Sequence, residues 1–286
     1  MRALITGGGG QLASDLRELI EDCVALSRAE LDVTDDQALR RAFANVRPEV
    51  VFNCAAFHNV EVCETEEDRA FAVNARAVKR LAQLCAESGA RLVHYSTNYV
   101  FDGCAKAPYG EDDRPNPRSV YAISKLAGEY AAIAYSPGAL VVRSAGLYGL
   151  HGSASKGGNF VTRMIARARE QGALRMVADQ LLTPTFTGDL AVASLAAVAA
   201  GAAGVLHLTN SGACSWYEFT RAIMELAGIE VAIEPVATTI TRGSPDRPRN
   251  GVLARPRADS LGLEPLRHWR EALAEYMRRA ELLSIA

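Results

Sequence analysis

The stretch Thr6-Gly7-Gly8-Gly9-Gly10-Gln11-Leu12-Ala13 decides the fold of this 286-residue chain. It follows an apolar run at residues 2–6 that predicts a strand, and it opens an amphipathic segment at 11–20 that predicts a helix. The spacing Gly7-x-x-Gly10-x-x-Ala13 is the one that a dinucleotide-binding turn needs. The first glycine permits the tight turn, and the second lets backbone amides approach a pyrophosphate at the helix N-terminus. The third position must be small so that the helix packs on the sheet.

The residues that follow alternate strand and helix patterns as far as residue 145. Strands are predicted at 23–26, 50–53, 92–96 and 140–143, and helices at 35–44, 66–88 and 119–134. A helix between successive strands indicates parallel strands with helices on both faces of the sheet. We therefore predict an α/β fold with a Rossmann-type, doubly wound parallel sheet.

The pattern changes after residue 146. We expect a Gly- and Ser-rich loop at 146–158, helices at 159–170, 187–200, 215–227 and 268–279, a last core strand at 205–208, and an Arg- and Pro-rich loop at 241–256. We predict that residues 1–146 and 184–210 form an NAD(P)-binding core. Residues 147–183 and 211–286 would then form a smaller, discontinuous C-terminal lobe that binds substrate.

The composition excludes several classes of protein. With 31 basic and 33 acidic residues, a net charge of -2 and a pI of about 6.2, the chain lacks the basic excess that binds nucleic acid. No apolar run of about 18 residues indicates a membrane span, and no signal peptide is evident, so we expect a cytoplasmic protein. None of the six cysteines forms a C-x-x-C pair, which favours buried reduced thiols, and no metal site is expected.

The end of the second predicted strand bears on the choice of cofactor. An acidic residue there would bind the ribose hydroxyls of NAD, but the sequence has Ser27 and Arg28. A hydroxyl and a cation suit the 2′-phosphate of NADP. We therefore predict NADP(H) as the cofactor and keep NAD(H) as the alternative. An ordinary surface arginine at position 28 stays open from the sequence.

Tyr121 and Lys125 lie one turn apart on the same face of a predicted helix. A lysine cation favours the phenolate and so lowers the pKa of a nearby tyrosine, which can then transfer a proton near neutral pH. Thr97 ends the fourth predicted strand, at the edge where ligands meet a parallel sheet. Its hydroxyl is suited to hold a substrate carbonyl.

Further motifs stand in a fixed order along nearly the whole chain. After the glycine turn they are Asn53-Cys54-Ala55-Ala56, Tyr95-Ser96-Thr97-Asn98-Tyr99-Val100-Phe101-Asp102-Gly103, Tyr121-x-x-x-Lys125, Gly157-Gly158-Asn159-Phe160, Asp179-Gln180, Thr183-Pro184-Thr185 and Cys214-Ser215-Trp216-Tyr217-Glu218-Phe219. Together they resemble the extended short-chain dehydrogenase/reductase superfamily, and more closely its dTDP-4-dehydrorhamnose reductase family. The resemblance implies that NAD(P)H delivers hydride to C4 of a nucleotide-linked 4-keto-6-deoxysugar.

The resemblance also implies roles for individual residues. Tyr121 would protonate the new alkoxide, Lys125 would lower the tyrosine pKa and bind the nicotinamide ribose, and Thr97 would hydrogen-bond the reacting carbonyl. The other cofactor contacts would come from Gly7, Gly10, Gln11, Leu12, Ser27, Arg28, Asp32, Val33, Ala55, Ala56, Phe57 and Tyr95. The substrate contacts would come from Thr97, Asn98, Gly146, Asn159 and Arg247.

Three positions depart from the family pattern, all on the substrate side. Asn98 stands where the family usually has Asp, which keeps hydrogen-bonding capacity but loses the charge. Gly146 stands where a Trp would pack on the sugar, so we expect room there. Val62 follows Glu61 in place of the usual Lys. These changes put the specific sugar in doubt and leave the cofactor and proton chemistry intact.

Two other functions stay open. One is an epimerase or dehydratase of the same superfamily, although a dehydratase is expected to have acidic residues where Asn98 stands. The other is a non-catalytic NADP-binding regulatory subunit, similar to the methionine adenosyltransferase β subunit. Arg247 is suited to a bidentate contact with a diphosphate, and a solvated surface arginine fits the sequence equally well. The expected partner is a nucleotide-sugar substrate, and a homodimer is left open.

Overall fold

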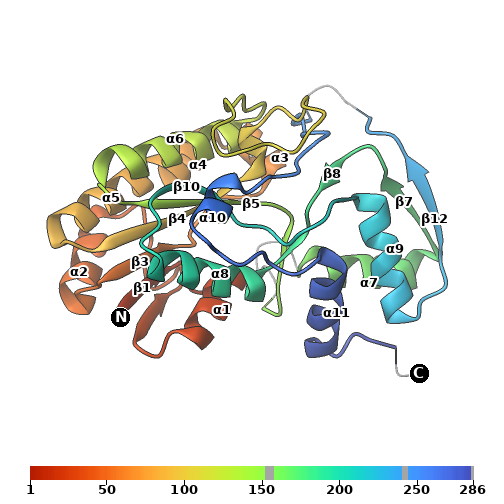
Figure 1. The fold of residues 1–286 in the computed structure, drawn as a ribbon, viewed down its shortest axis with the longest axis horizontal. Coiled ribbons are helices and arrows are strands. Elements are labelled where there is room, and N and C mark those ends of the chain that lie inside the picture. The colour runs from red at the N-terminus through yellow and green to blue at the C-terminus, as the bar shows by residue number, and fades with distance from the viewer. Residues whose placement is uncertain (152–157, 240–243, 285–286) are drawn as a thin grey trace.

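The computed structural model describes residues 1–151, 158–239 and 244–284. Its main feature is a six-stranded sheet that lies between two layers of helices and beside a smaller lobe (Figure 1). The strands run in the order β10 (Gly204–His207), β5 (Leu140–Ser144), β4 (Arg91–Thr97), β3 (Val50–Asn53), β1 (Ala3–Thr6) and β2 (Cys23–Leu26). Every neighbouring pair is parallel. The predicted Rossmann-type sheet is confirmed.

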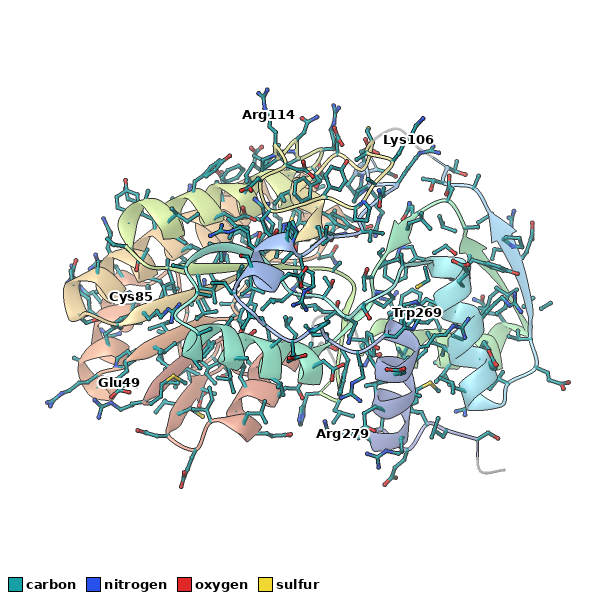
Figure 2. All side chains as sticks on the ribbon, viewed as in Figure 1. Glu49, Cys85, Lys106, Arg114, Trp269 and Arg279 are labelled. Carbon is teal, nitrogen blue, oxygen red and sulfur yellow. The ribbon has the colours of Figure 1, made fainter. Side chains whose placement is uncertain are left out.

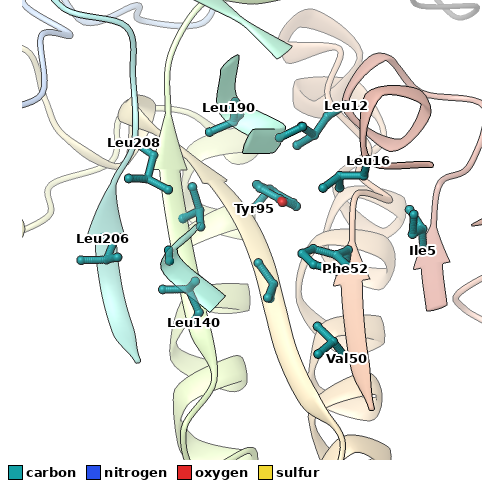
Figure 3. Close-up of a cluster of buried hydrophobic side chains, with 14 of the residues drawn as sticks. Ile5, Leu12, Leu16, Val50, Phe52, Tyr95, Leu140, Leu190, Leu206 and Leu208 are labelled. Carbon is teal, nitrogen blue, oxygen red and sulfur yellow. The ribbon is translucent and has the colours of Figure 1, made fainter. Parts of the chain in front are cut away.

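Helices cover both faces of this sheet, which is why its strands are apolar on both sides. On one face lie α1 (Gln11–Leu19) and α8 (Thr187–Ala199), whose leucines pack with Phe52 and Tyr95 (Figure 3). On the other face lie α2 (Asp36–Val46), α5 (Ala77–Ser88) and α6 (Val120–Tyr135). The caps follow local rules: the Asp35 side chain accepts from two amides at the start of α2, and Gly89 ends α5 in the left-handed conformation.

The long helix predicted at 66–88 is divided. The structure has α3 (Val60–Thr65), α4 (Glu67–Phe71), a π-helical turn at Ala72–Arg76, and then α5. The π-helical turn contains the buried Asn74, whose amide bonds to the backbone of Phe57 and to the Ser124 hydroxyl. Turns of this kind are frequent at functional sites. Apolar periodicity does not reveal such a turn, because the signal is a single polar side chain with distant partners.

The smaller lobe has a core of its own. Its helices are α7 (Phe160–Gln171), α9 (Trp216–Ala227) and α11 (Trp269–Arg279), and its parallel strand pair is β7 (Ala173–Val177) with β12 (Ala232–Val236). Trp269, labelled in Figure 2, begins α11 and packs edge-on against Phe219. Sequence reasoning missed both strands of this pair. It also missed two-residue pairs that join β6 (Leu147–Tyr148) to β9 (Thr185–Phe186) and β8 (Leu181–Leu182) to β11 (Cys214–Ser215), because two residues are too short to show alternation.

The segment that precedes α11 returns to the sheet. The described part of the predicted loop 241–256 pairs Leu253 with Tyr109 and leads into α10 (Pro256–Ser260). Ala258 of α10 belongs to the apolar cluster under β10. Of the loop predicted at 146–158, residues 152–157 lie outside the described residues, and with them Gly157 of the family motif.

Two further findings concern the described part of the chain. None of its helices is long and apolar enough to span a membrane. All six cysteines are free thiols, and Cys104 is exposed where a buried thiol was expected. His94 and His207 are both buried.

Candidate active site

The glycine turn packs closely against the end of β2 and against the residues that follow β3. Gly7 has a φ of +69°, and a Cβ there would lie 2.8 Å from the Ala55 amide nitrogen. A Cβ on Gly8 would lie 2.9 Å from the backbone of Leu26, to which the Gly8 amide donates at 2.8 Å. Only glycine fits both positions, because the obstacle is backbone rather than a movable side chain.

This turn meets the requirements of a pyrophosphate site. Gly10 is the N-cap of α1 and offers no side-chain cap, so the first-turn amides at Gln11 and Leu12 have no acceptor within the helix. The side-chain oxygen of Gln11 is buried and without a hydrogen-bond partner among the described residues. Free amides at a helix N-terminus favour an anion. The residues present therefore fit the diphosphate of a dinucleotide.

The end of β2 lies against the glycine turn, and the turn that follows β2 contains an acid, Glu30, that sequence reasoning missed. The amide of Ser27 donates to the Glu30 carboxylate at 2.8 Å, and the pKa of Glu30 is lowered by hydrogen bonds from the hydroxyl and amide of Ser27. The Ser-x-x-Glu spacing was the available signal. Arg28 and Asp32 are exposed, the Asp32 carboxylate accepts from the amide and hydroxyl of Thr34 at 2.9 and 2.7 Å, and Val33 is buried.

The residues after β3 form a short strap beside the glycine turn. Ala55, Ala56 and Phe57 are half-buried, and the amide of Phe57 donates to Asn74 Oδ1 at 2.9 Å. The guanidinium of Arg69 lies over the Phe57 ring, 4.5 Å from its centroid. Because Asn74 of the π-helical turn bonds to Phe57 and to Ser124, the strap and helix α6 are fixed to one another.

Thr97 and Tyr121 meet at the edge of the sheet. Thr97 ends β4, and the Ser119 side chain caps α6 so that Tyr121 stands in its first turn. The Thr97 hydroxyl is hydrogen-bonded to the phenol of Tyr121, which lowers the phenol pKa, but burial is the larger effect and raises that pKa. Tyr99 packs edge-on against Tyr121 with ring centroids 5.9 Å apart.

The contact that Lys125 makes in the structure is not one that the sequence predicted. Its Nζ is buried and donates to the carbonyl oxygen of Tyr95 at 2.6 Å. Burial lowers its pKa to about 8, opposed by the Glu129 carboxylate. Burial outweighs the lowering effects on the Tyr121 pKa, so the expected lowering of that pKa is not seen. The Lys125 ammonium is directed at a backbone carbonyl, because a buried ammonium needs an oxygen acceptor.

Tyr95 has two separate roles in this arrangement. Its carbonyl faces Lys125, while its ring is buried between α1 and α8 with Leu12 and Leu190 (Figure 3). The alternation of side chains along β4 explains the division, since successive residues point to opposite faces of the sheet.

Two of the expected substrate residues lie beside this edge. Asn98 is buried, and its amide nitrogen donates to the carbonyl oxygen of Gly251 at 2.9 Å. Arg247 donates to the Tyr99 hydroxyl at 3.4 Å and forms an ion pair with Glu61. Arg249 and Asn250, which follow Arg247, line an open pocket of about 400 Å³ together with Leu181 and with Lys106 from the loops of the core.

The other two expected substrate residues are placed differently. Gly146 has a φ of +56°, and a Cβ there would lie 2.7 Å from Leu182 Cδ1 and 3.2 Å from Pro184 Cα. The expected room beside Gly146 is therefore filled, because Leu182 of β8 and Pro184 pack there. Asn159 caps α7, and its amide nitrogen donates to Gly149 O and to the Tyr276 hydroxyl, each at 2.7 Å. Its hydrogen bonds are engaged within the lobe.

Comparisons with known proteins agree with this geometry. A family model described as the RmlD substrate binding domain matches residues 1–282. The chain belongs to this family. The chain is 39% identical to the spore coat polysaccharide biosynthesis protein SpsK of Bacillus subtilis, over 97% of each chain. It is 41% identical to a dTDP-4-dehydrorhamnose reductase of Streptomyces griseus, over 96% of this chain and 92% of the relative.

A solved member of the RmlD family gives the same result in three dimensions. The dTDP-4-dehydrorhamnose reductase of Bacillus anthracis, solved in complex with NADP, matches with a TM-score of 0.92 and 31% identity. The match covers 97% of this chain and 99% of that chain. The resemblance inferred from the sequence motifs is confirmed.

Beneath the carboxyl end of β4 in this RmlD family member lies a charged pair that sequence reasoning missed. Arg143 of β5 donates to Glu129 of α6 from Nε at 2.9 and 3.2 Å and from Nη2 at 2.7 Å. The Glu129 carboxylate also accepts from the Ser96 hydroxyl. Glu129 lies one helical turn after Lys125, so the spacing Lys-x-x-x-Glu was the local signal, but the partner on β5 was not visible from it.

Proposed function

We propose that the chain is an NADPH-dependent reductase of the C4 keto group of a dTDP-linked 4-dehydro-6-deoxysugar, as in dTDP-L-rhamnose biosynthesis. The observation that carries this proposal is the hydrogen-bonded pair of Thr97 and Tyr121 at the sheet edge that also holds the glycine turn. A family relative named as a reductase of dTDP-4-dehydrorhamnose and a solved relative with NADP support the same reaction. NAD(H) remains the alternative cofactor.

The cofactor-binding residues are proposed to divide the dinucleotide between them. Gly7, Gly10 and the first-turn amides of α1 hold the diphosphate. Ser27 and Arg28 bind the 2′-phosphate, because a hydroxyl and a guanidinium are both donors to phosphate oxygens. The strap Ala55–Phe57 lies along the inner ribose, and Lys125 hydrogen-bonds the nicotinamide ribose. The bound cofactor supplies the hydride.

Tyr121 is proposed to donate the proton that neutralises the oxygen at C4. Thr97 hydrogen-bonds the same oxygen and places it within reach of the phenol. Burial keeps the phenol protonated before reaction, since burial raises its pKa. The Lys125 ammonium, whose pKa lies at about 8, adds a positive charge one turn away that favours loss of this proton during the reaction.

The substrate is proposed to lie between the core 1–146 and 184–210 and the lobe 147–183 and 211–286. Arg247 comes from the lobe side and stands beside Tyr99, which packs on Tyr121. A guanidinium at that place suits the diphosphate of a nucleotide sugar. Asn98 supports this arrangement by tying β4 to the segment that carries Arg247.

We further propose that the enzyme is cytoplasmic and forms a homodimer. Free thiols at all six cysteines fit a reducing compartment. One surface of α6 exposes the apolar side chains of Ile123, Tyr130 and Ile133, which lie at helical spacing. Exposed apolar stripes of this kind favour burial against a second subunit.

The test of the reaction is NADPH oxidation with the keto sugar generated in situ from dTDP-glucose. Turnover with NADPH that exceeds turnover with NADH supports the proposal. Absence of turnover, with cofactor binding intact, contradicts it and favours the regulatory-subunit alternative. A tightly retained NAD in the purified protein favours an epimerase.

A further inference from the structure

Arg247 and Glu61 form an ion pair that joins the lobe to the core beside the catalytic residues. Glu61 lies in the first turn of α3, and Arg247 lies between β12 and α10. One terminal nitrogen of Arg247 contacts the Glu61 carboxylate, and the other donates to the Tyr99 hydroxyl at 3.4 Å. Tyr99 packs in turn against Tyr121. A carboxylate therefore already binds the lobe-side cation that contacts Tyr99, the neighbour of Tyr121.

We propose that Glu61 occupies the place of the substrate's diphosphate on Arg247 and thereby sets the affinity for the nucleotide sugar. The inference rests on the proposed function, because it takes the substrate to carry a diphosphate. The Glu61 carboxylate accepts from one terminal nitrogen of Arg247. A phosphate that binds the guanidinium in bidentate fashion needs the same nitrogen, so substrate and Glu61 compete for it.

The pair is placed so that a ligand can open it. The side chains of Arg247 and Glu61 are 36% and 59% exposed, so solvent and ligands reach both. The backbone around Arg247 is fixed independently of Glu61. Asn250 donates from its side chain to the carbonyls of Ala105 and Ala107 at 2.9 and 3.0 Å, and Asn98 donates to Gly251. These contacts hold the backbone near Arg247 whatever the position of the Glu61 side chain.

Glu61 opposes the substrate in two ways. The substrate must break an ion pair before Arg247 can bind it, and the released carboxylate then stays close to the diphosphate with a charge of the same sign. A glutamine at position 61 removes both effects and keeps the shape of the side chain. The competing idea, that Glu61 orients Arg247 for the substrate, predicts the opposite sign, since loss of the carboxylate would then weaken binding.

The experiment measures the dissociation constant of dTDP by calorimetry on the NADP⁺-loaded protein. We expect Glu61→Gln to bind dTDP about two- to fivefold more tightly, the span that corresponds to an exposed ion pair. The KM for the keto sugar falls by the same factor. Glu234→Gln is the matched control, because Glu234 pairs with Arg175 at 3.0 Å on the far strands of the lobe, and it leaves dTDP binding unchanged.

The same substitution in an Arg247→Met protein shows whether the effect of Glu61 on dTDP affinity depends on Arg247. In Arg247→Met, adding Glu61→Gln tightens dTDP binding less than it does in the wild-type background if the two side chains compete as proposed, because only the repulsion between the carboxylate and the diphosphate is then left to remove. If Glu61→Gln tightens dTDP binding equally in the Arg247→Met protein, the effect comes from the overall electrostatic field of the protein, and the proposal is overturned. The proposal is also overturned if Glu61→Gln alone binds dTDP no more tightly than the wild type, or if the wild type does not bind dTDP. Glu61→Gln alone decides the sign, so the proposal does not depend on whether Arg247→Met folds.

The same data separate this inference from the proposed reaction. If the wild type binds dTDP and Glu61→Gln tightens it, but NADPH is not oxidised with the keto sugar, the inference stands and the proposed reaction falls. If turnover is normal and Glu61→Gln raises the KM, the reaction stands and the inference falls.

Discussion

Replacing Glu129 by Gln is expected to destabilise the fold and to shift the pH dependence of turnover. Glu129 and Arg143 have side chains only 1% and 4% exposed, and three N–H···O contacts of 2.7 to 3.2 Å join them. A glutamine carries no charge, so the buried guanidinium loses its counter-ion. Removing one partner of a buried ion pair costs about 3–5 kcal/mol. The retained amide oxygen of Gln places the expected cost at the lower end of that range.

This cost is a large part of the total stability, which for a folded domain is about 5–15 kcal/mol. A chain of this size loses about 2 °C of melting temperature for each kcal/mol. We therefore expect the melting temperature of Glu129→Gln to fall by about 6 °C. The double variant Glu129→Leu with Arg143→Met is expected to lose less, because it leaves no unpaired charge in the interior.

The pH effect follows from Lys125. Burial lowers the pKa of Lys125 to about 8, and the Glu129 carboxylate opposes that lowering. Lys125 is charged below pH 8 and loses its proton as the pH rises through that value, so turnover that needs the charge declines above about pH 8. Without Glu129 the lysine pKa falls further, and the declining part of the rate profile moves to lower pH.

The assay combines thermal unfolding with initial rates of NADPH oxidation across the pH range. The reasoning predicts a lower melting temperature and an earlier decline with rising pH in the same variant. An unchanged melting temperature would show that the pair is not a buried, coupled one. An unchanged or later decline would show that Glu129 does not act on Lys125, or that the lysine charge is not needed for turnover.

Two further variants, Gly7→Ala with Gly9→Ala as its control and Arg28→Ala, test the cofactor site. Gly7→Ala forces a β-carbon to within 2.8 Å of the Ala55 amide at a φ of +69°, so we expect a loss of about 1–3 kcal/mol in unfolding free energy and weaker NADPH binding by fluorescence titration. Gly9→Ala is the control, because a β-carbon at position 9 has no atom within 4 Å, and its melting temperature is expected to equal that of the wild type. An equal loss of unfolding free energy in both variants would refute the steric argument. Arg28→Ala is expected to raise the KM for NADPH more than that for NADH, and equal changes would exclude a 2′-phosphate contact.

Local sequence signals were sufficient for most of the core. The strands at 23–26 and 50–53 were predicted with the bounds that the structure shows, because short apolar runs between turn residues have few other interpretations. Asp35 and Ser119 were visible as residues that begin helices, since capping depends only on neighbouring amides. The glycine turn was visible for the same reason, as its conformation is set by the adjoining strand and helix.

What the sequence could not show depends on partners far along the chain. The ion pair of Arg247 with Glu61 joins residues 186 positions apart, and no pattern in either segment predicts it. The acceptor of Lys125 is a backbone carbonyl, which every residue has. Gly146 suggested open space because a smaller residue replaced a larger one, but packing filled that space from β8. The two-residue strands of the lobe were too short to show the alternation of apolar and polar residues that predicts a strand.

The measurement that tests the central claim most directly is the turnover of Tyr121→Phe with NADPH and the dTDP-linked keto sugar, beside its affinity for NADPH. Loss of a positioned acid lowers the rate by about 10²–10⁴-fold. We predict a loss of kcat within that range with the NADPH dissociation constant unchanged, because the phenylalanine keeps the packing against Tyr99. Wild-type kcat in Tyr121→Phe would contradict the account, since the proton at C4 would then come from another group.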